Sequence, residues 1–313
     1  MSARGLLPVV PLILFCVPPA FGQLPKRVEK CLPYPTLAQE IRATEPASQV
    51  PPAVTVRVSR VEFDSNGAIP EIAKEEVSAE LRSHVFHPDR ETAYLDDLAN
   101  EIAEVTVREA LQNRGYFKTI ASAKLMKING QGSEISVAAV ISAKSGPQYR
   151  TGSIRIESAD DSSLQFSPPV LRRLIPLQIG DLFNVGAVRT GLENLRRAYA
   201  REGYIDMTTE PVTEIDEAHE TIDTVLRINQ EAQYRVGTIA LLGVNTSTQE
   251  KLMESLPKTG QIFDWTHLDD FFKRNRAILP SDASIEDVNV RRDLKSKTVA
   301  ISLDLRTCPQ YAN

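Results

Sequence analysis

The chain has 313 residues, of which 42% are hydrophobic and 25% are charged, and its formal net charge at pH 7 is −5. This composition is typical of a soluble globular protein, and the length suits two or three small domains. A mildly acidic balance argues against non-specific nucleic-acid binding, which needs a basic surface. After residue 22, no apolar run approaches the roughly 20 residues of a membrane-spanning helix.

The first 22 residues have the three parts of a secretory signal. A basic start with Arg4 precedes an apolar run, Leu6–Val17, and the small-x-small triplet Ala20-Phe21-Gly22 follows. We therefore expect cleavage after Gly22 and export of the protein. An uncleaved anchor is the alternative, but prolines interrupt this run and it is too short to span a bilayer.

Residues 23–53 contain six prolines and are expected to form a linker. Cys16 leaves with the signal, whereas Cys31 in the linker and Cys308 in the tail at 307–313 flank the rest of the chain. In an exported protein these two cysteines could form a disulfide, although it would have to join the two ends of the chain. Free or intermolecular thiols are the alternative.

The remaining chain reads as three successive units with the order β-α-α-β-β, at 54–146, 147–230 and 231–306. The first is expected to have strands at Val54–Phe63 (with a bulge near Ser59), Ala121–Ile128 and Glu134–Ser142, helices at Pro70–Arg82 and Glu91–Asn113, and a turn at Asn129–Gly132. The second has strands at Gly152–Glu157, Met207–Ile215 and Thr221–Ile228, with a short helix at Pro168–Leu174 and a long one after Gly180. The third has strands at Val236–Leu242, Ile285–Arg291 and Thr298–Leu305, and helices at Thr248–Leu256 and Trp265–Arg276.

The stretch Gly180–Tyr204 carries the clearest helical pattern in the chain. Its apolar residues step by three or four positions, which places them on one face of a helix: Val185, Val188, Leu192, Leu195 and Tyr199. Gly203 can adopt the left-handed conformation that ends a helix. Parts of this pattern recur 80 residues downstream and 88 residues upstream, and YRTGSI at Tyr149 recurs as YRVGTI at Tyr234. The chain therefore contains a repeat, of which the third copy is atypical because no Gly-Tyr follows its long helix.

These motifs, in their order and spacing, resemble the POTRA repeat of outer-membrane barrel assembly factors and two-partner secretion transporters. The residues that carry the resemblance, and that we expect to be structural, are Tyr149, Gly152, Gly180, Phe183, Tyr199, Gly203, Tyr204, Tyr234, Gly237 and Gly243. The resemblance covers Val54 to Arg306. It implies an α+β fold in which two helices cover one face of a three-stranded mixed sheet. It also implies a periplasmic location, associated with the outer membrane of a Gram-negative-type cell, and the handling of unfolded polypeptides.

Proteins of this kind usually continue into a membrane barrel, for which the residues after Arg306 are too few, so insertase or pore activity is not carried over. The sequence shows no nucleophile motif, phosphate loop or paired-cysteine metal site, and its four histidines are scattered. We therefore expect no enzyme activity, metal or cofactor. Arg196, Arg197 and Arg201 could contact lipid headgroups or an acidic partner, but interleaved glutamates favour a solvated helix face.

The predicted binding site is a sheet edge, where unpaired backbone groups can accept an extended peptide. By the resemblance, the second strand of each unit lies at this edge. The first of these strands is the least protected by charge or proline, and it comprises Ala121, Ser122, Ala123, Lys124, Leu125, Met126, Lys127 and Ile128. We expect extended client polypeptides to pair here, and the protein to associate with the membrane only through an outer-membrane barrel or secretion and assembly complex. The alternative is a structural envelope or division scaffold with one fixed partner.

Overall fold

A computed structural model describes residues 55–64, 69–86, 94–131, 134–160, 162–281 and 283–306. The expected signal, linker and tail, which include Cys31 and Cys308, lie outside the described residues. Within the described ranges, no helix combines the length and the apolar character needed to cross a bilayer.

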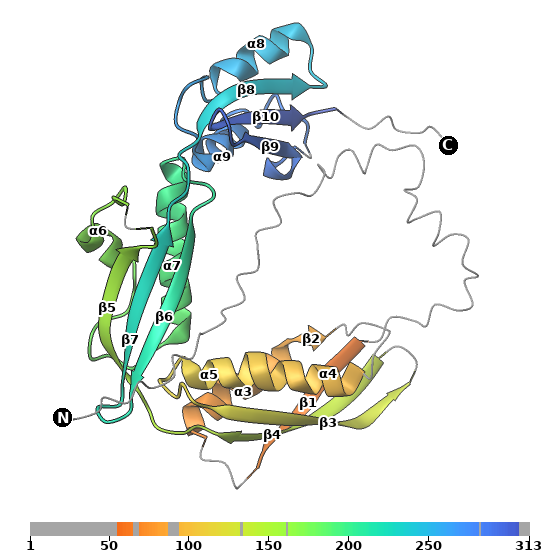
Figure 1. Cartoon of the computed structure of the whole chain (residues 1–313). Coiled ribbons are helices and arrows are strands. Elements are labelled where there is room, and N and C mark those ends of the chain that lie inside the picture. The colour runs from red at the N-terminus through yellow and green to blue at the C-terminus, as the bar shows by residue number, and fades with distance from the viewer. Residues whose placement is uncertain are drawn as a thin grey trace, which may run out of the picture.

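The first unit is a four-stranded sheet with helices on one face (Figure 1). Its elements are β1 (Thr55–Phe63), α3 (Glu71–Ser83), β2 (Val85–Phe86), α4 (Tyr94–Glu101), a π-helical segment (Ile102–Val107), α5 (Arg108–Gln112), β3 (Ile120–Gln131) and β4 (Glu134–Lys144). The strand order is β2-β1-β4-β3, with β1 parallel to β4 and the other pairs antiparallel. A bulge in β1 at Ser59 agrees with the expected one. The sheet has one strand more than expected because Val85 and Phe86, directly after α3, pair with β1.

Two other features of this unit differ from the sequence pattern. The long helix is continuous from 94 to 112, but its middle turn is π-helical, a wider turn that frequently occurs at functional sites. The expected turn at Asn129–Gly132 is wrong for Asn129 and Gly130, because β3 continues to Gln131 and pairs with β4 past a bulge between Lys127 and Asn129.

The second unit has a three-stranded sheet of order β5-β7-β6. Its elements are β5 (Arg150–Ser158), α6 (Pro168–Arg172), α7 (Val185–Arg201), β6 (Thr208–Asp216) and β7 (Thr221–Asn229). The Asn184 side chain accepts a hydrogen bond from the Ala187 N–H at 2.8 Å and so caps the start of α7. Val188, Leu195 and Tyr199 are buried along one side of α7, which places its apolar face against the sheet.

The third unit repeats this arrangement, with strand order β8-β10-β9. Its elements are β8 (Arg235–Leu242), α8 (Thr246–Glu254), α9 (Trp265–Arg274), a 3-10 turn (Ile285–Asp287), β9 (Val288–Asp293) and β10 (Thr298–Asp304). The expected helix end at Arg276 is wrong, because the Asn275 side chain donates to the Phe271 carbonyl at 2.8 Å and terminates α9. The expected strand at Ile285–Arg291 begins later, because Ser284 and Asp287 form a capping box around the 3-10 turn.

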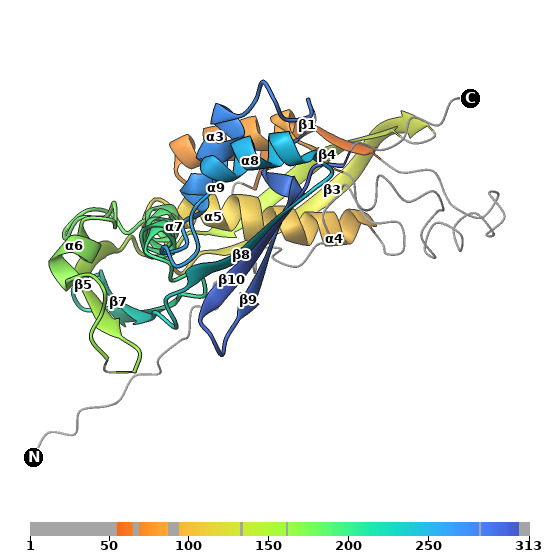
Figure 2. The same cartoon turned by 90° about the horizontal axis from the view of Figure 1, so that it is seen from above.

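Each unit therefore has its own sheet, its own buried apolar cluster and a helix layer. Figure 2 shows α8 and α9 on one side of the third sheet. The expected α+β fold of tandem mixed sheets is confirmed, with the additional strand β2 in the first unit.

Candidate functional site

Each sheet has one edge strand that comes second in the common β-α-α-β-β order. β3, β6 and β9 each hydrogen-bond to a single neighbouring strand in the described sheets, namely β4, β7 and β10. β3 is the longest of the three, with 12 residues, against nine in β6 and six in β9. An edge strand presents unpaired N–H and C=O groups that can hydrogen-bond to another extended chain.

The direction of the free backbone groups on β3 follows from the hydrogen bonds of its neighbour. The Ile141 carbonyl on β4 accepts from the Asp64 N–H at 2.8 Å, so the backbone groups of Ile141 point towards β1. Ala123 lies directly opposite Ile141. In an antiparallel pair, opposite residues either bond to each other or both point away. The N–H and C=O of Ala123 therefore point outward, and those of Ala121 and Leu125 do the same by alternation.

The side chains of β3 alternate between the helix layer and the open face of the sheet. Ala121, Ala123 and Leu125 are partly buried against the core of the first unit. On this face α4 and the π-helical segment contact β3, and α4 lies over β3 in Figure 1. Lys124 and Met126 are exposed on the other face. The helix layer therefore covers one face of this edge strand, and the other face is open to solvent.

The second edge, β6, differs from β3 in both backbone and charge. The Ile228 carbonyl accepts from the Ala159 N–H at 2.9 Å, and Thr209 lies opposite Ile228, so Thr209 and Pro211 occupy outward-facing positions. Proline has no N–H, which removes one of the donors that an added strand would need. Glu210 and Glu214 give this strand an acidic character. β6 is therefore the more protected edge.

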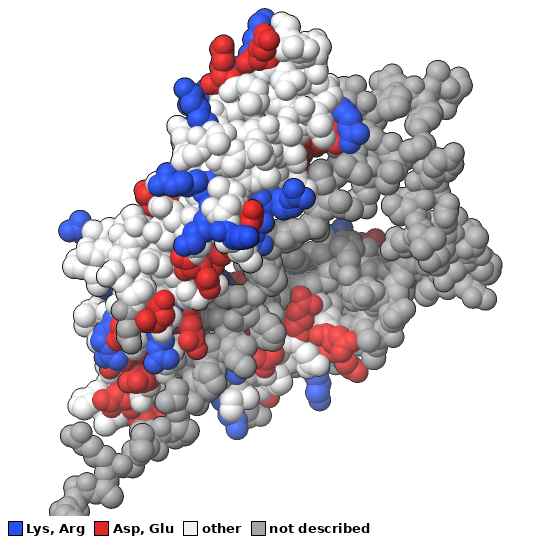
Figure 3. Space-filling view, turned by 45° about the horizontal axis from the view of Figure 1, so that its top comes forward, with Lys and Arg blue, Asp and Glu red and all other residues white. Residues whose placement is uncertain are grey.

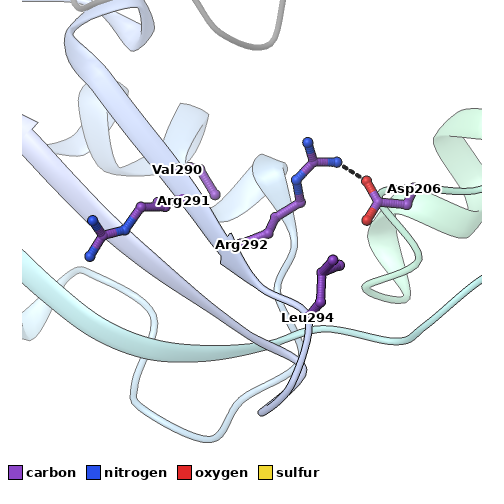
Figure 4. A pocket seen from close by; sticks show the side chains of 5 residues that line it. All are labelled: Asp206, Val290, Arg291, Arg292 and Leu294. Carbon is purple, nitrogen blue, oxygen red and sulfur yellow. Dashed lines mark hydrogen bonds and ion pairs between the residues drawn. The ribbon is translucent and has the colours of Figure 1, made fainter.

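The third edge, β9, is short and ends in charged residues. Asn289, Arg291 and Arg292 are exposed. Arg292 pairs with Asp206 of the second unit, whereas Arg291 points away from it (Figure 4). An open hollow between the second and third units is lined by Asp206, Val290, Arg291, Arg292 and Leu294.

The junctions between successive units share one backbone arrangement. The Tyr149 N–H donates to the Gly115 carbonyl at 2.8 Å, and the Tyr149 carbonyl accepts from the Phe183 N–H at 3.0 Å. In the next junction the Tyr234 N–H donates to the Gly203 carbonyl at 2.9 Å, and the Tyr234 carbonyl accepts from the Phe263 N–H at 3.0 Å. Each tyrosine therefore joins the helix end of one unit to the core of the next.

The two junction glycines have no room for a side chain. Gly115 and Gly203 have φ angles of +85° and +83°, which favour glycine. A Cβ atom would lie 2.7 Å from the Tyr149 carbonyl oxygen at Gly115, and 2.6 Å from the Tyr234 carbonyl oxygen at Gly203. The Gly-Tyr motif thus ends a helix and also allows the following unit to approach closely.

An ion pair beside the junction tyrosine spans each junction, and the polarity of this pair is reversed between the two junctions. At the first junction Glu109 of the first unit also pairs with Arg189 of the second at 2.6 Å. Lys118 of the first unit pairs with Glu217 of the second, whereas Asp206 of the second unit pairs with Arg292 of the third. Lys118 and Asp206 each follow the junction glycine by three positions. Sequence reasoning missed these pairs, although the opposite charges at this shared position were visible.

The acid of each ion pair also accepts a hydrogen bond from the junction tyrosine. The Tyr149 hydroxyl donates to Glu217 at 2.7 Å, and the Tyr234 hydroxyl donates to Asp206 at 2.8 Å. Burial, followed by the hydrogen bond to the carboxylate, raises the pKa of each phenol to about 12. The hydrogen bonds from Lys118 and then Tyr149 lower the pKa of the Glu217 carboxyl below its ordinary value.

The other motif residues have local roles in the units. Phe183 is buried and meets Phe117 of the first unit edge to face, with ring centroids 5.6 Å apart, and Tyr199 meets Tyr204 in the same way at 5.7 Å. Gly152 and Gly237 lie in β5 and β8, and Gly180 and Gly243 have positive φ in turns. Unlike the junction glycines, Gly180 has no heavy atom within 4 Å of the position of a Cβ.

The face of the molecule in Figure 3 carries charged side chains of both signs. Basic side chains gather near the centre of the face in Figure 3, with acidic side chains directly beside them. On α7, Arg196 and Arg197 both pair with Glu193. His84 is exposed and packs against Phe86, and among the described residues no three His, Cys, Asp or Glu side chains group as metal ligands.

Comparisons with known proteins agree with this fold. Residues 149–231 match the POTRA family, described as the surface antigen variable number repeat. The structure is similar to POTRA domains 3–5 of Haemophilus influenzae BamA, with a TM-score of 0.57 and 17% identity over 83% of this chain and 100% of that one. Similarity to POTRA domains 1–3 of Omp85 from Anabaena is weaker, with a TM-score of 0.32 and 14% identity over 82% of this chain and 97% of that one.

A relative named as an outer membrane protein assembly factor, from Treponema pallidum (strain Nichols), is 26% identical over 221 residues. The match covers 68% of this chain and 25% of the relative, so the chain spans about a quarter of that protein's length. The resemblance to POTRA repeat proteins is therefore confirmed, and the family match falls on the second unit.

Proposed function

We propose that this chain is a periplasmic POTRA-repeat scaffold that binds extended polypeptide segments and takes part in outer-membrane protein assembly or secretion. The relation to an outer membrane protein assembly factor supports the general role. The observation that carries the binding step is the β3 edge, where Ala121, Ala123 and Leu125 direct their backbone groups away from the sheet. An extended segment would add to this edge as a further strand.

Backbone pairing suits a protein that handles many different segments. The hydrogen bonds of a strand pair involve N–H and C=O groups that every residue except proline supplies, so they tolerate varied sequences. The proposal involves no catalytic step and no cofactor. The protein would reach the outer membrane through a barrel or assembly complex to which it docks.

Two proline substitutions test the binding edge in a matched way. Ala123→Pro removes an outward N–H and leaves the β3–β4 ladder intact, as Pro211 does naturally on β6. Lys124→Pro removes an N–H that bonds to β4 and leaves its acceptor unpaired, which should destabilise the first unit by about 1–3 kcal/mol. We expect Ala123→Pro to keep the melting temperature within a few degrees but to abolish the amide-exchange protection of β3 by an added barrel-derived peptide. Unchanged protection in this folded variant would contradict the proposed site.

Photocrosslinking in cells separates the two candidate roles. A photoreactive residue at Ser122, on the open face of β3, should capture several outer-membrane protein precursors. The control position is Glu210, an exposed residue with the same orientation on β6. A single stoichiometric partner at Ser122 would instead support a structural envelope or division scaffold with one fixed partner. Equal capture of precursors at both positions would contradict the preference for β3.

A further inference from the structure

The open face of the β3 edge combines one cation with flanking apolar side chains. Lys124 is exposed there, and Met126, the next residue on the same face, is 48% exposed. At the start of the strand, Ile120 is 70% exposed, and at its bulge Ile128 is 46% exposed. Large apolar side chains at this exposure are costly to leave in water along a free edge, and natural edges are usually protected by charge or proline instead.

The lysines of this strand have no acidic partner in the described part of the chain. On the same sheet, Arg57 pairs with Glu134 and Arg60 pairs with Glu62, whereas no described ion pair involves Lys124 or Lys127. The edge itself carries no acid between Ile120 and Gln131. A strand added beside β3 would therefore meet positive charge without a counter-ion, and opposite charges on neighbouring strands stabilise a pair.

The helix face of the same edge favours small or apolar side chains. Ala121 and Ala123, whose backbone groups point outward, contribute little side-chain bulk beneath the helix layer. Val105, in the π-helical segment that lies over β3, is 55% exposed. An added strand would place every second side chain in this space between the sheet edge and the helix, where apolar contact is available.

We propose that β3 selects extended segments whose two faces differ. One face of the segment carries a carboxylate flanked by apolar residues, and the other face carries small or apolar residues. The carboxylate lies beside Lys124, and the apolar residues of that face lie beside Ile120 and Met126. This inference rests on the proposed function, because it names the class of polypeptide that the edge takes. Backbone pairing provides affinity for any extended segment, and Lys124 provides the preference for segments that carry the carboxylate.

A second copy of the chain fits this edge less well than such a segment. Two β3 strands that pair antiparallel about Lys124 would place the two lysines opposite each other, and like charges in that position are destabilising. The occupant is therefore a polypeptide of opposite charge rather than another β3. Sedimentation of the purified exported protein should give a monomer, and a dimer that Ala123→Pro dissociates would overturn this choice of occupant.

Two synthetic ten-residue peptides test the selectivity directly. Both alternate Val and Ala on one face and carry Leu on the other, and they differ only in a central residue of that second face, Glu in one and Lys in the other. With the exported protein we expect the Glu peptide to bind about threefold to fivefold more tightly, which corresponds to the strength of one cross-strand ion pair. In the Lys124→Glu variant the order of the two peptides should reverse. Lys258→Glu changes the same charge at an exposed position of the third unit and should leave the order unchanged.

The outcomes distinguish the selectivity from the binding itself. Equal affinity of the two peptides for the wild type, with amide protection in β3, would overturn the preference and leave the proposed function standing. Failure of both peptides to protect β3, while a barrel-derived segment does, would also overturn it. Absence of protection of β3 by any of these peptides would contradict the proposed function. A reversal in the Lys258→Glu control would mean that net charge, rather than Lys124, decides the preference.

Discussion

The two junctions between the units have the same backbone and opposite charges. In both, a tyrosine N–H donates to the carbonyl of a left-handed glycine, and the tyrosine carbonyl accepts from a phenylalanine N–H of the next unit. A glutamine before each tyrosine also donates to the preceding helix end, at 2.9 Å from Gln148 to Arg114 and 2.9 Å from Gln233 to Glu202. This shared part of the junction requires glycine and a buried aromatic ring.

The ion pairs beside the junction tyrosines distinguish the two junctions. The preceding unit supplies the cation, Lys118, at the first junction, and the anion, Asp206, at the second. Joining the first unit to the third would place Lys118 against Arg292, and such like-charge contacts are unfavourable. The shared backbone does not distinguish the second unit from the third as the partner of the first, whereas the charges of Lys118 and Arg292 disfavour joining the first unit to the third. The first junction also has a helix contact, in which the Gly186 N–H donates to Asn113 at 2.7 Å.

The largest expected effect concerns the shared glycine. Gly203→Ala should destabilise the junction between the second and third units by about 3 kcal/mol, from roughly 1–2 kcal/mol for the left-handed conformation and a similar amount for the clash with Tyr234. Gly115→Ala should have an equal effect on the first junction. Denaturant unfolding with amide exchange of the adjoining strands measures both.

Gly180→Ala is the control for these two substitutions. Gly180 has a φ of +88° but nothing within 4 Å of a Cβ, so this variant should lose only the conformational part of the free energy. If Gly180→Ala and Gly203→Ala were equally destabilising, close approach to Tyr234 would not be the reason for glycine at the junction.

A smaller effect is expected from the polarity of the ion pair. Asp206→Lys removes the acceptor of the Tyr234 hydroxyl and places a second cation beside Arg292, and should destabilise the junction by about 1–3 kcal/mol. Most of this comes from the hydroxyl, because the pair itself is partly exposed and contributes under about 1 kcal/mol. Adding Arg292→Asp gives the second junction the polarity of the first and should recover part of the loss. In a double-mutant cycle, simple additivity of the two changes would argue against pairing across the junction.

The last expected effect is a loss of stability that both junctions share and that appears only at alkaline pH. The folded state raises the pKa of Tyr149 and Tyr234 from the ordinary 10.0 to about 12, so it holds these protons more tightly than the unfolded chain. Their contribution to stability is complete below pH 10 and is lost as the pH rises towards 12. Burial raises the pKa of Tyr199 to about 12 as well. Ultraviolet titration of tyrosinate should show three tyrosines that ionise near pH 12 in the wild type, and two in Tyr149→Phe or Tyr234→Phe. Ionisation of all three near pH 10 with unchanged circular dichroism would contradict this account.

The sequence predicted the elements that depend on local patterns. The apolar spacing along α7, the glycine after it and the repeated Tyr-Arg motif together indicated three β-α-α-β-β units, because helix faces, caps and turns are set by neighbouring residues. Boundaries failed where a local hydrogen bond ended an element early, as Asn275 does in α9. The candidate edge was also predictable to the level of the strand, through the resemblance to POTRA repeats.

The amino-acid sequence by itself determined the repeated α+β unit. The spacing of its apolar residues and its positive-φ glycines fix helices, strands and turns through contacts between residues that are close in the chain. The tertiary structure decided which backbone groups of β3 point outward, because that depends on the pairing of Ile141 with Ala123 and Asp64, residues far apart in the chain. It also decided that Lys118 meets Glu217, 99 residues away, and that Asp206 meets Arg292, 86 residues away. Such contacts exist only after two units have docked, and no local pattern specifies the partner.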